Sequence, residues 1–274
     1  LHVAVIEGHK TLVELLIRHK ADVNVENREG AGPLALAARR KDKAIVELLI
    51  QNGAHVVGQT SDSVSPLNEA VRQGQEDIVE LLISKGADCK AKGRNLRTPL
   101  HSAAQQGHIR LVDILLNVGV ELAPVDVEGI TPLHLATANN HLAVVKLLVG
   151  KGANINTPDK NGLTPLYLAT DHPNVEMISF LLDCGADLES ADVRGNRPLH
   201  NAAGRGHVAV AEILLARGAN INAVNNDHWT PLFVAAGQGH KAIVELLLAH
   251  KADATIRDKA NATPMDIAMQ RGSK

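Results

Sequence analysis

The chain has 274 residues, of which 45% are hydrophobic and 21% charged, so it holds enough apolar material for an ordered core and is not disordered throughout. Its formal net charge of −2 gives no general reason to expect nucleic acid or an anionic membrane surface as a partner. No apolar run approaches the roughly 20 residues that span a bilayer, so we expect no direct membrane insertion.

Prolines recur along the chain with a period of 33 residues and without a slip. They are Pro33, Pro66, Pro99, Pro132, Pro165, Pro198, Pro231 and Pro264. An alanine stands four residues after each of them, and a leucine stands sixteen residues after each but the last. Such self-similarity indicates stacked repeats that share their core positions.

One copy, residues 131–156, shows the elements that each period predicts. Thr131 can cap a short first helix, and Pro132 suits its first turn. Residues 141–152 carry a broad apolar face, which indicates a second helix, and Gly152 can end that helix in the left-handed conformation. The Asp, Asn and Gly residues that follow favour a tight turn. Each copy is therefore predicted to be a helix, a turn, a helix and a protruding β-turn tip.

This pattern resembles the ankyrin-repeat family. Residues 98–101 and 131–134 both read Thr-Pro-Leu-His, and the Gly-His and Gly-Ala-Asp/Asn phases of that family recur along the whole chain. The resemblance implies an all-α solenoid of about nine copies, with a partial repeat over 1–31, seven copies phased on the prolines from Pro33 to Pro231, and a partial repeat from Pro264. Because each copy is stable only against its neighbours, we expect a single domain over 1–274. Both ends look cut, so we also expect a fragment of a longer protein.

The fourteen histidines do not point to a metal site. Nine of them fall into two phases of the repeat, whereas metal ligands gather at one place. They are His2, His101, His134 and His200 in one phase, and His9, His108, His141, His207 and His240 in the other. The resemblance implies that these histidines form hydrogen bonds between copies. We expect no metal, no cofactor and no catalytic residue, because no nucleophile, phosphate-binding or dinucleotide motif is present.

Two copies depart from the common pattern in ways that predict local changes of structure. Leu96 stands at a glycine phase and Gly93 at an aspartate phase, so the tip between them should be reshaped. Asp171, His172 and Pro173 interrupt the sixth copy between its helices, where the proline should shorten the first helix.

The family resemblance also implies that partners bind in a concave groove made of the turn tips and the exposed sides of the first helices. On that surface residues 37–44, Ala-Ala-Arg-Arg-Lys-Asp-Lys-Ala, keep the apolar pattern but change the exposed positions. Basic residues at matching exposed phases form a candidate row: Arg28, Arg39, Arg40, Lys41, Arg72, Lys92, Arg94 and Arg97. Arginine binds carboxylate and phosphate groups through paired donors, so this row predicts an acceptor for an acidic or phosphorylated segment. A solvated face produced by drift between repeats is the alternative.

Further along the chain the predicted tips become apolar. The candidate partner-binding residues there are Val127, Ile130, Leu163, Val193 and Trp229. Trp229 is the one tryptophan of the chain, and tryptophan often marks the centre of a binding interface. Packing of its ring on the adjacent turn is the alternative interpretation.

These observations predict a non-enzymatic protein–protein interaction module whose partner carries an acidic or phosphorylated segment next to apolar side chains. The alternative is a structural spacer or scaffold array within a larger membrane-associated, toxin or effector protein. Nucleic acid is disfavoured, because the bases are local and one aromatic tip offers little stacking. Two cysteines, Cys89 and Cys184, provide no disulfide framework, which fits an intracellular location, either cytoplasmic or nuclear.

Overall fold

The computed structural model describes residues 1–57 and 64–270, and in these ranges the chain forms seventeen α-helices, one 3₁₀ helix and no strand. The α-helices alternate between short first helices and nine-residue second helices. The first helices are α1 His2–Ile6, α3 Pro33–Arg40, α5 Pro66–Arg72, α7 Pro99–Gln106, α9 Pro132–Ala138, α11 Pro165–Ala169, α13 Pro198–Arg205, α15 Pro231–Gln238 and α17 Pro264–Gln270. The second helices are α2 Lys10–Arg18, α4 Lys43–Gln51, α6 Glu76–Ser84, α8 Ile109–Asn117, α10 Leu142–Gly150, α12 Val175–Asp183, α14 Val208–Ala216 and α16 Lys241–Ala249.

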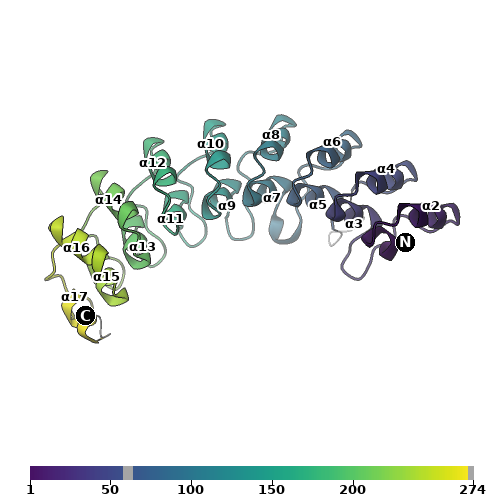
Figure 1. The fold of residues 1–274 in the computed structure, drawn as a ribbon. Helices are drawn as coiled ribbons and strands as arrows, with labels where there is room; N and C mark the ends of the chain where they lie inside the picture. Colours follow the sequence, from purple (N-terminus) through teal and green to yellow (C-terminus); the bar gives the residue numbers. More distant parts are fainter. Residues whose placement is uncertain (58–63, 271–274) are drawn as a thin grey trace. The chain divides into compact units, whose positions relative to one another are not determined.

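The chain divides into two compact units, Leu1–Val127 and Glu128–Lys274. Within each unit, first helices pack on neighbouring first helices and second helices on neighbouring second helices, so that each unit is an all-α solenoid of two layers (Figure 1). The turn tips extend from the layer of first helices (Figure 1). The expectation of a single domain over 1–274 stays a prediction.

The first helices begin where the Thr-Pro pairs predict them. The hydroxyl of Thr131 accepts a hydrogen bond from the backbone N–H of His134 at 3.3 Å, and Pro132 occupies the first turn, where an N–H would have no partner. Thr164 and Thr230 cap α11 and α15 in the same way. The pair therefore sets the start of the first helices that carry it, whereas Gly32, Ser65 and Arg197 precede the prolines of α3, α5 and α13.

The core consists of the small and aliphatic residues that recur in every copy. The alanines four residues after each proline, from Ala37 to Ala235, are buried and allow neighbouring first helices to approach closely. The leucines of the second helices, from Leu49 to Leu247, are fully buried between the two layers. A single helix pair cannot bury this face alone, so each pair depends on the pairs beside it.

Neighbouring tips are joined by backbone hydrogen bonds. In the first unit, Val64 N–H donates to Gly30 C=O at 2.7 Å. In the second unit, Val193 N–H donates to Asn161 C=O at 2.8 Å, and Asn226 N–H donates to Arg194 C=O at 2.9 Å. These bonds fix the spacing of the tips within each unit.

Both expected irregularities are confirmed. The tip after α6 contains the 3₁₀ helix Arg94–Leu96, in which Asn95 and Leu96 have φ angles of 60° and 61°. Leu96 thus adopts the left-handed conformation that a glycine phase requires, at a steric cost for a branched side chain. Helix α11 has five residues where α13 has eight, because Pro173 follows and residues 170–172 leave the helix.

Candidate partner-binding surface

We define the tip-side surface of each unit as its turn tips together with the exposed sides of its first helices. Histidines at the starts of the first helices hold neighbouring turn tips in place through hydrogen bonds. In α9, the backbone N–H of Thr131 donates to Nδ1 of His134 at 3.1 Å, and Nε2 of the same ring lies 3.1 Å from the carbonyl oxygen of Leu163 in the next tip. Because a backbone N–H can only donate, Nδ1 must accept and Nε2 carries the proton. His134 therefore links the start of its own helix to the following tip.

His200 makes the equivalent bridge in α13. Its Nδ1 accepts from Arg197 N–H at 3.2 Å, and its Nε2 donates to the carbonyl of Trp229 at 3.0 Å. Burial, with a smaller contribution from the nearby Arg197 charge, lowers the pKa of His200 to about 4. The imidazole is therefore neutral at physiological pH.

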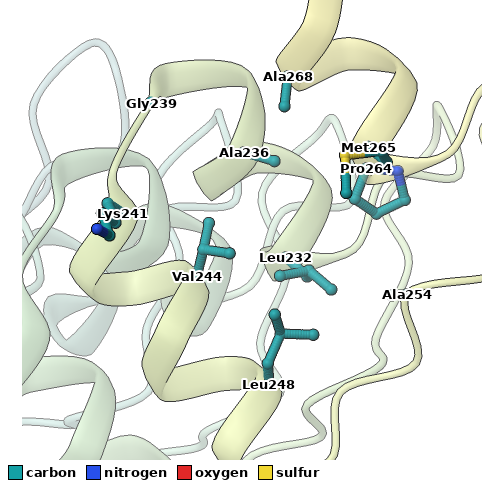
Figure 2. Close-up of a pocket in the computed structure, with 10 residues that line it drawn as sticks. All are labelled: Leu232, Ala236, Gly239, Lys241, Val244, Leu248, Ala254, Pro264, Met265 and Ala268. Carbon is teal, nitrogen blue, oxygen red and sulfur yellow. The ribbon is translucent and has the colours of Figure 1, made fainter. Parts of the chain in front are cut away.

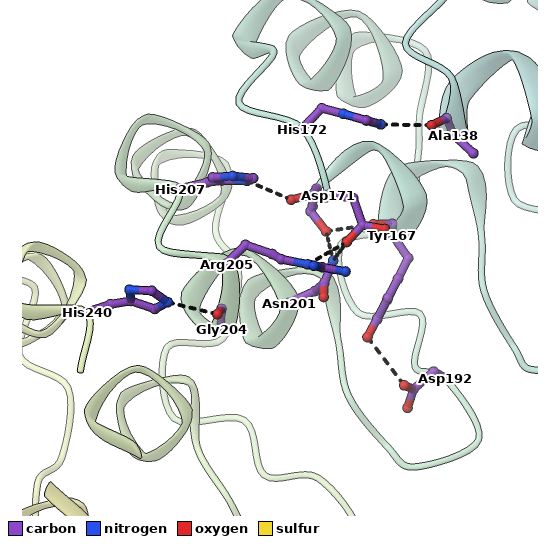
Figure 3. A network of polar contacts seen from close by, with 11 residues as sticks. Ala138, Tyr167, Asp171, His172, Asp192, Asn201, Gly204, Arg205, His207 and His240 are labelled. Carbon is purple, nitrogen blue, oxygen red and sulfur yellow. Dashed lines mark hydrogen bonds and ion pairs between the residues drawn. The ribbon is translucent and has the colours of Figure 1, made fainter. Parts of the chain in front are cut away.

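Histidines of the second phase connect the copies at the other end of the first helices. His207 lies 3.1 Å from the carbonyl of Thr170, and His240 lies 3.0 Å from the carbonyl of Gly204 (Figure 3). Each ring thus reaches a carbonyl near the C-terminus of the preceding first helix, which has no partner inside its own helix. The expected bonds between copies are present at both histidine phases.

Three copies carry Asp42, Gln75 or Asn174 in place of the histidine, and in the first of these copies Arg40 takes over the structural role. Asp42 occupies the histidine phase there, and its carboxylate accepts from Ile45 N–H at 3.0 Å, which caps α4. A carboxylate cannot donate to the preceding helix, and Arg40 Nη1 does so instead, at 2.6 Å from the carbonyl of Ile6. The same exchange occurs in the sixth copy, where Asn174 caps α12 and His172 donates to the carbonyl of Ala138 at 2.8 Å (Figure 3).

We expect Arg40→Ala to increase the hydrogen-exchange rate of α1 and α2 amides about fivefold, because losing one hydrogen bond to a helix end costs about 1 kcal/mol. The double variant Arg40→Ala/Asp42→His should restore protection, since histidine supplies the donor in other copies. Arg28→Ala, which alters an exposed tip residue, is the matched control. Failure of the histidine to restore protection would contradict this role for Arg40.

Two further members of the basic row, Arg39 and Arg72, share one carboxylate. Arg39 Nε lies 3.1 Å and Arg72 Nη2 lies 2.6 Å from Glu69 Oε2, which is largely buried on α5. The three side chains carry a net charge of +1, because one carboxylate balances one of the two guanidinium groups. Each guanidinium has five N–H donors, so the pair keeps donors for a further anionic group.

Arg97 is held more deeply than the rest of the row. Its Nε lies 3.1 Å from Asp126 Oδ2, whose side chain is 2% exposed, and its Nη1 donates to Gln105 at 3.2 Å. Arg28, Lys41 and Lys92 are exposed at the surface of the first unit. The side chain of Arg94 lies outside the described residues. The basic row therefore combines surface cations with arginines that serve the fold, and its binding role stays a prediction.

The predicted apolar tips differ in exposure. Val127 in the first unit and Val193 in the second are exposed, with 64% of Val193 accessible. Ile130 and Leu163 are half-buried in the second unit. Trp229 is also half-buried: its ring stacks on Phe233 with a centroid distance of 5.4 Å, and its Nε1 donates to Asp258 Oδ2 at 3.3 Å. The ring of Trp229 is thus packed on its neighbours and still forms part of the surface.

Beside Trp229, the tip-side surface of the second unit contains a hollow of about 520 Å³, which we call the Trp229 hollow. It is lined by Tyr167, Arg194, Asn196, His200, Asn201, Gly204, Arg205, Asn225, Asp227, Trp229, Val234 and Gln238. Gly204 and Gly237 share a phase of the first helices at which the other copies carry Ile, Arg, Gln, Ala or Asp, so Gly204 places no side chain in the hollow. An added Cβ at Gly204 would lie 3.1 Å from Val234 Cγ1, so this glycine also admits the valine of the next helix.

Polar groups hold one wall of the Trp229 hollow in place. Arg205 Nε lies 2.9 Å from Asp171 Oδ1, and the amide of Asn201 donates to the same oxygen at 2.9 Å (Figure 3). Tyr167 donates its hydroxyl proton to Asp192 Oδ2 at 3.3 Å, and burial together with that carboxylate raises the pKa of the phenol. The wall thus presents a fixed guanidinium and a neutral phenol.

A family model described as ankyrin repeats, in three copies, matches residues 1–93, 89–159, 152–225 and 217–274. The chain belongs to the ankyrin-repeat family. The resemblance noted in the sequence is therefore confirmed over its whole length. No curated protein matches the chain in a sequence comparison.

Ankyrin repeats are in general protein–protein interaction modules and are typically non-enzymatic. Within residues 1–57 and 64–270, no cluster of three His, Cys, Asp or Glu side chains has the arrangement of a metal site. The same ranges contain no helix of the length and apolarity needed to cross a bilayer. Burial raises the pKa of the Cys89 thiol, which disfavours the reactive thiolate.

Sequence reasoning found Trp229 but missed the hollow beside this ankyrin-repeat tip. Tyr167, Gly204 and Arg205 line it from two other copies. One signal was available: Gly204 lies inside a first helix, where glycine costs about 1 kcal/mol relative to alanine. A glycine inside a helix, which recurs at this phase in Gly237, indicates a position where a side chain would obstruct a neighbouring helix or a ligand.

Proposed function

We propose that this ankyrin-repeat chain is a protein-binding module and that the Trp229 hollow receives a partner segment in which an apolar side chain stands next to an acidic residue. The observation that supports this most directly is the hollow itself, which Trp229, Gly204 and Arg205 line together. Interface sites commonly combine an aromatic anchor with a small number of fixed polar groups.

The two parts of the proposed ligand follow from the chemistry of the lining. Trp229 and Val234 offer an apolar wall to an aliphatic or aromatic side chain. Arg194 is exposed on the rim, and Arg205 is held in one orientation by Asp171, so a carboxylate can meet prearranged donors. A rigid guanidinium loses less conformational entropy on binding than a mobile one.

In the first unit, the same proposal assigns a second acidic contact to the basic row. Arg39 and Arg72 keep a net positive charge after pairing with Glu69. Arg28 and Lys92, at exposed phases of the adjacent copies, are also exposed. A carboxylate or phosphate group that meets Arg39 and Arg72 together would gain donors from both guanidinium groups. Each unit thus has its own candidate site for an acidic group of the partner.

Selection of displayed random peptides against the immobilised chain tests the Trp229 hollow. We expect the recovered peptides to pair an acidic residue with an adjacent large apolar residue and to lose affinity about tenfold on Gly204→Gln, which fills the hollow. Gly204→Ala is the matched control, because it adds the same Cβ contact with Val234 without the longer side chain. Arg194→Glu should weaken acidic peptides selectively, since it reverses one rim charge.

The peptide selection can also contradict the proposal. If the wild-type chain enriches no peptides beyond those that Gly204→Gln also enriches, while circular dichroism shows both chains folded, the hollow is not a binding site. A spacer or scaffold array would then be the better description of the chain.

A further inference from the structure

The two sides of the Trp229 hollow carry opposite charges. Arg194 lies in the tip that leads into α13, and Asp227 stands at the same phase one copy later, in the tip that leads into α15. The two tips lie side by side, because Asn226 N–H donates to the carbonyl oxygen of Arg194 at 2.9 Å. Both charged side chains are exposed, and both line the hollow. A ligand in the hollow therefore meets a guanidinium on one copy and a carboxylate on the next.

The C-terminal ends of the two first helices repeat this difference between the copies. Arg205 is the last residue of α13, and its counterpart at the end of α15 is the neutral Gln238. Asp171 holds the guanidinium of Arg205 (Figure 3). Over residues 1–57 and 64–270, no hydrogen bond or ion pair engages the side chain of Arg194, Asp227 or Gln238. The charges of Arg194 and Asp227 are thus available to a ligand.

This arrangement of charges restricts the ligand that the hollow favours. An acidic group beside Arg194 is attracted, but a second acidic group beside Asp227 is repelled. A segment with two basic groups meets the same conflict in reverse. Trp229 and Val234, which form the apolar wall, belong to the copy that carries Asp227. A segment with one acidic and one basic residue satisfies both charged groups and can still place an apolar side chain on that wall.

Amide side chains in the lining favour an extended segment over a helical one. Asn196 Oδ1 accepts from Asn225 Nδ2 at 2.7 Å, so these two amides hold the tips together. The amide of Gln238 is exposed and offers both donors and an acceptor. An extended main chain leaves its N–H and C=O groups in need of partners, whereas a helix pairs most of its own. Gln238 can bond both groups of one peptide unit in an extended segment.

We propose that the Trp229 hollow selects an extended partner segment in which an acidic and a basic residue stand about three residues apart, with a large apolar residue between them. This inference rests on the proposed binding function and adds the basic residue, the spacing and the extended conformation to it. Packed helices lie about 8–10 Å apart, and an extended chain rises about 3.3 Å per residue. About three residues therefore carry the segment from the copy of Arg194, which meets the acidic residue, to the copy of Asp227, which meets the basic one.

A different hollow in the same unit has to be distinguished from this one. It lies between α15, α16 and α17, has a volume of about 250 Å³ and is lined mainly by apolar side chains (Figure 2). Lys241 is the one charged residue among those that line it. A peptide held by its apolar side chain alone would enter this hollow as readily. Met265→Glu, a change at a lining residue that is 63% exposed, should therefore leave binding at the Trp229 hollow unchanged.

The test resynthesises the peptides recovered from the displayed library with glutamine in place of their basic residue. On the wild-type chain we expect this replacement to lower affinity about threefold, as the loss of an exposed ion pair does. On Asp227→Asn it should change affinity little, because the partner of the basic residue is already removed. The matched control is Glu212→Gln, which removes an exposed carboxylate from α14 in the layer of second helices and should preserve the threefold difference.

A second selection, against Asp227→Lys, should recover peptides with acidic residues at both positions. The assignment of opposite charges is wrong if glutamine lowers affinity equally on the wild-type chain and on Asp227→Asn, even where Gly204→Gln shows that the peptides occupy the hollow. A spacing of about seven residues between the two charges would indicate a helical ligand and would overturn the extended segment. Failure of the proposed function itself gives a different result, because peptide binding then survives Gly204→Gln, and both proposals fall together.

Discussion

Arg97→Ala is expected to lower the free energy of unfolding of the first unit by about 3 kcal/mol. Arg97 Nε lies 3.1 Å from Asp126 Oδ2, and that carboxylate is almost entirely shielded from water. Removing the guanidinium takes away the opposite charge that offsets the desolvation of the carboxylate. Urea unfolding followed by circular dichroism, compared at equal denaturant slope, measures the change.

Two variants show whether this loss comes from the buried pair. Arg28→Ala removes an exposed arginine of the same predicted row and should change the free energy of unfolding by less than about 0.5 kcal/mol. Arg97→Ala/Asp126→Ala removes both charges and should be more stable than Arg97→Ala alone, because the buried carboxylate whose desolvation Arg97 offsets is then removed as well. If Arg97→Ala is as mild as Arg28→Ala, Arg97 is a surface cation and its place in the binding row gains support.

The fold could be predicted from the sequence because the same capping, turn and core residues recur in successive copies. The Thr-Pro pair marks the start of first helices, and the glycine phases mark left-handed ends, so one copy explains its neighbours. The two departures from the pattern could also be predicted: Pro173 predicted a short α11, and Leu96 predicted a reshaped tip. Both depend on backbone conformation, which local sequence controls directly.

The partners of the basic row could not be predicted in the same way. Arg39 meets Glu69, and Arg40 meets the carbonyl of Ile6, each about one repeat away along the chain. Their phase in the repeat places these side chains on the exposed side of a first helix, but long side chains reach several neighbours from there. Only their rotamers decide between an internal partner and an external one.

One part of the pattern could have been predicted from the sequence: which residue replaces the donor histidine in the copies that lack it. Asp42 and Asn174 both replace the donor histidine by a residue that favours helix capping, and in each case a donor stands two residues earlier. Arg40 and His172 are those donors. An unpaired helix end must find a partner somewhere, so a missing donor at one phase predicts a substitute close by.

Lowering the pH from 6.5 to 4 is expected to reduce the free energy of unfolding of the second unit by about 3 kcal/mol through His200 alone. The pKa of His200 is about 4 in the folded chain and near 6.5 when unfolded, so below pH 6.5 the unfolded state binds a proton that the folded state does not. The contribution is unchanged above pH 6.5, is lost progressively down to pH 4, and is constant below that. The physical cause of the lowered pKa is burial, with a smaller contribution from the Arg197 charge, and protonation of Nδ1 would also break the bond that it accepts from Arg197 N–H.

His200→Phe isolates this contribution, because Phe233 stands at the same phase in the next copy and shows that the site accepts an aromatic ring. The variant should be less stable than the wild-type chain at pH 7 but should lose less stability between pH 6.5 and 4. His19→Gln removes an exposed histidine and should keep the full pH dependence. Denaturant unfolding at several pH values compares the three chains, and an identical pH dependence in wild type and His200→Phe would show that acid acts on this ankyrin-repeat unit through other groups.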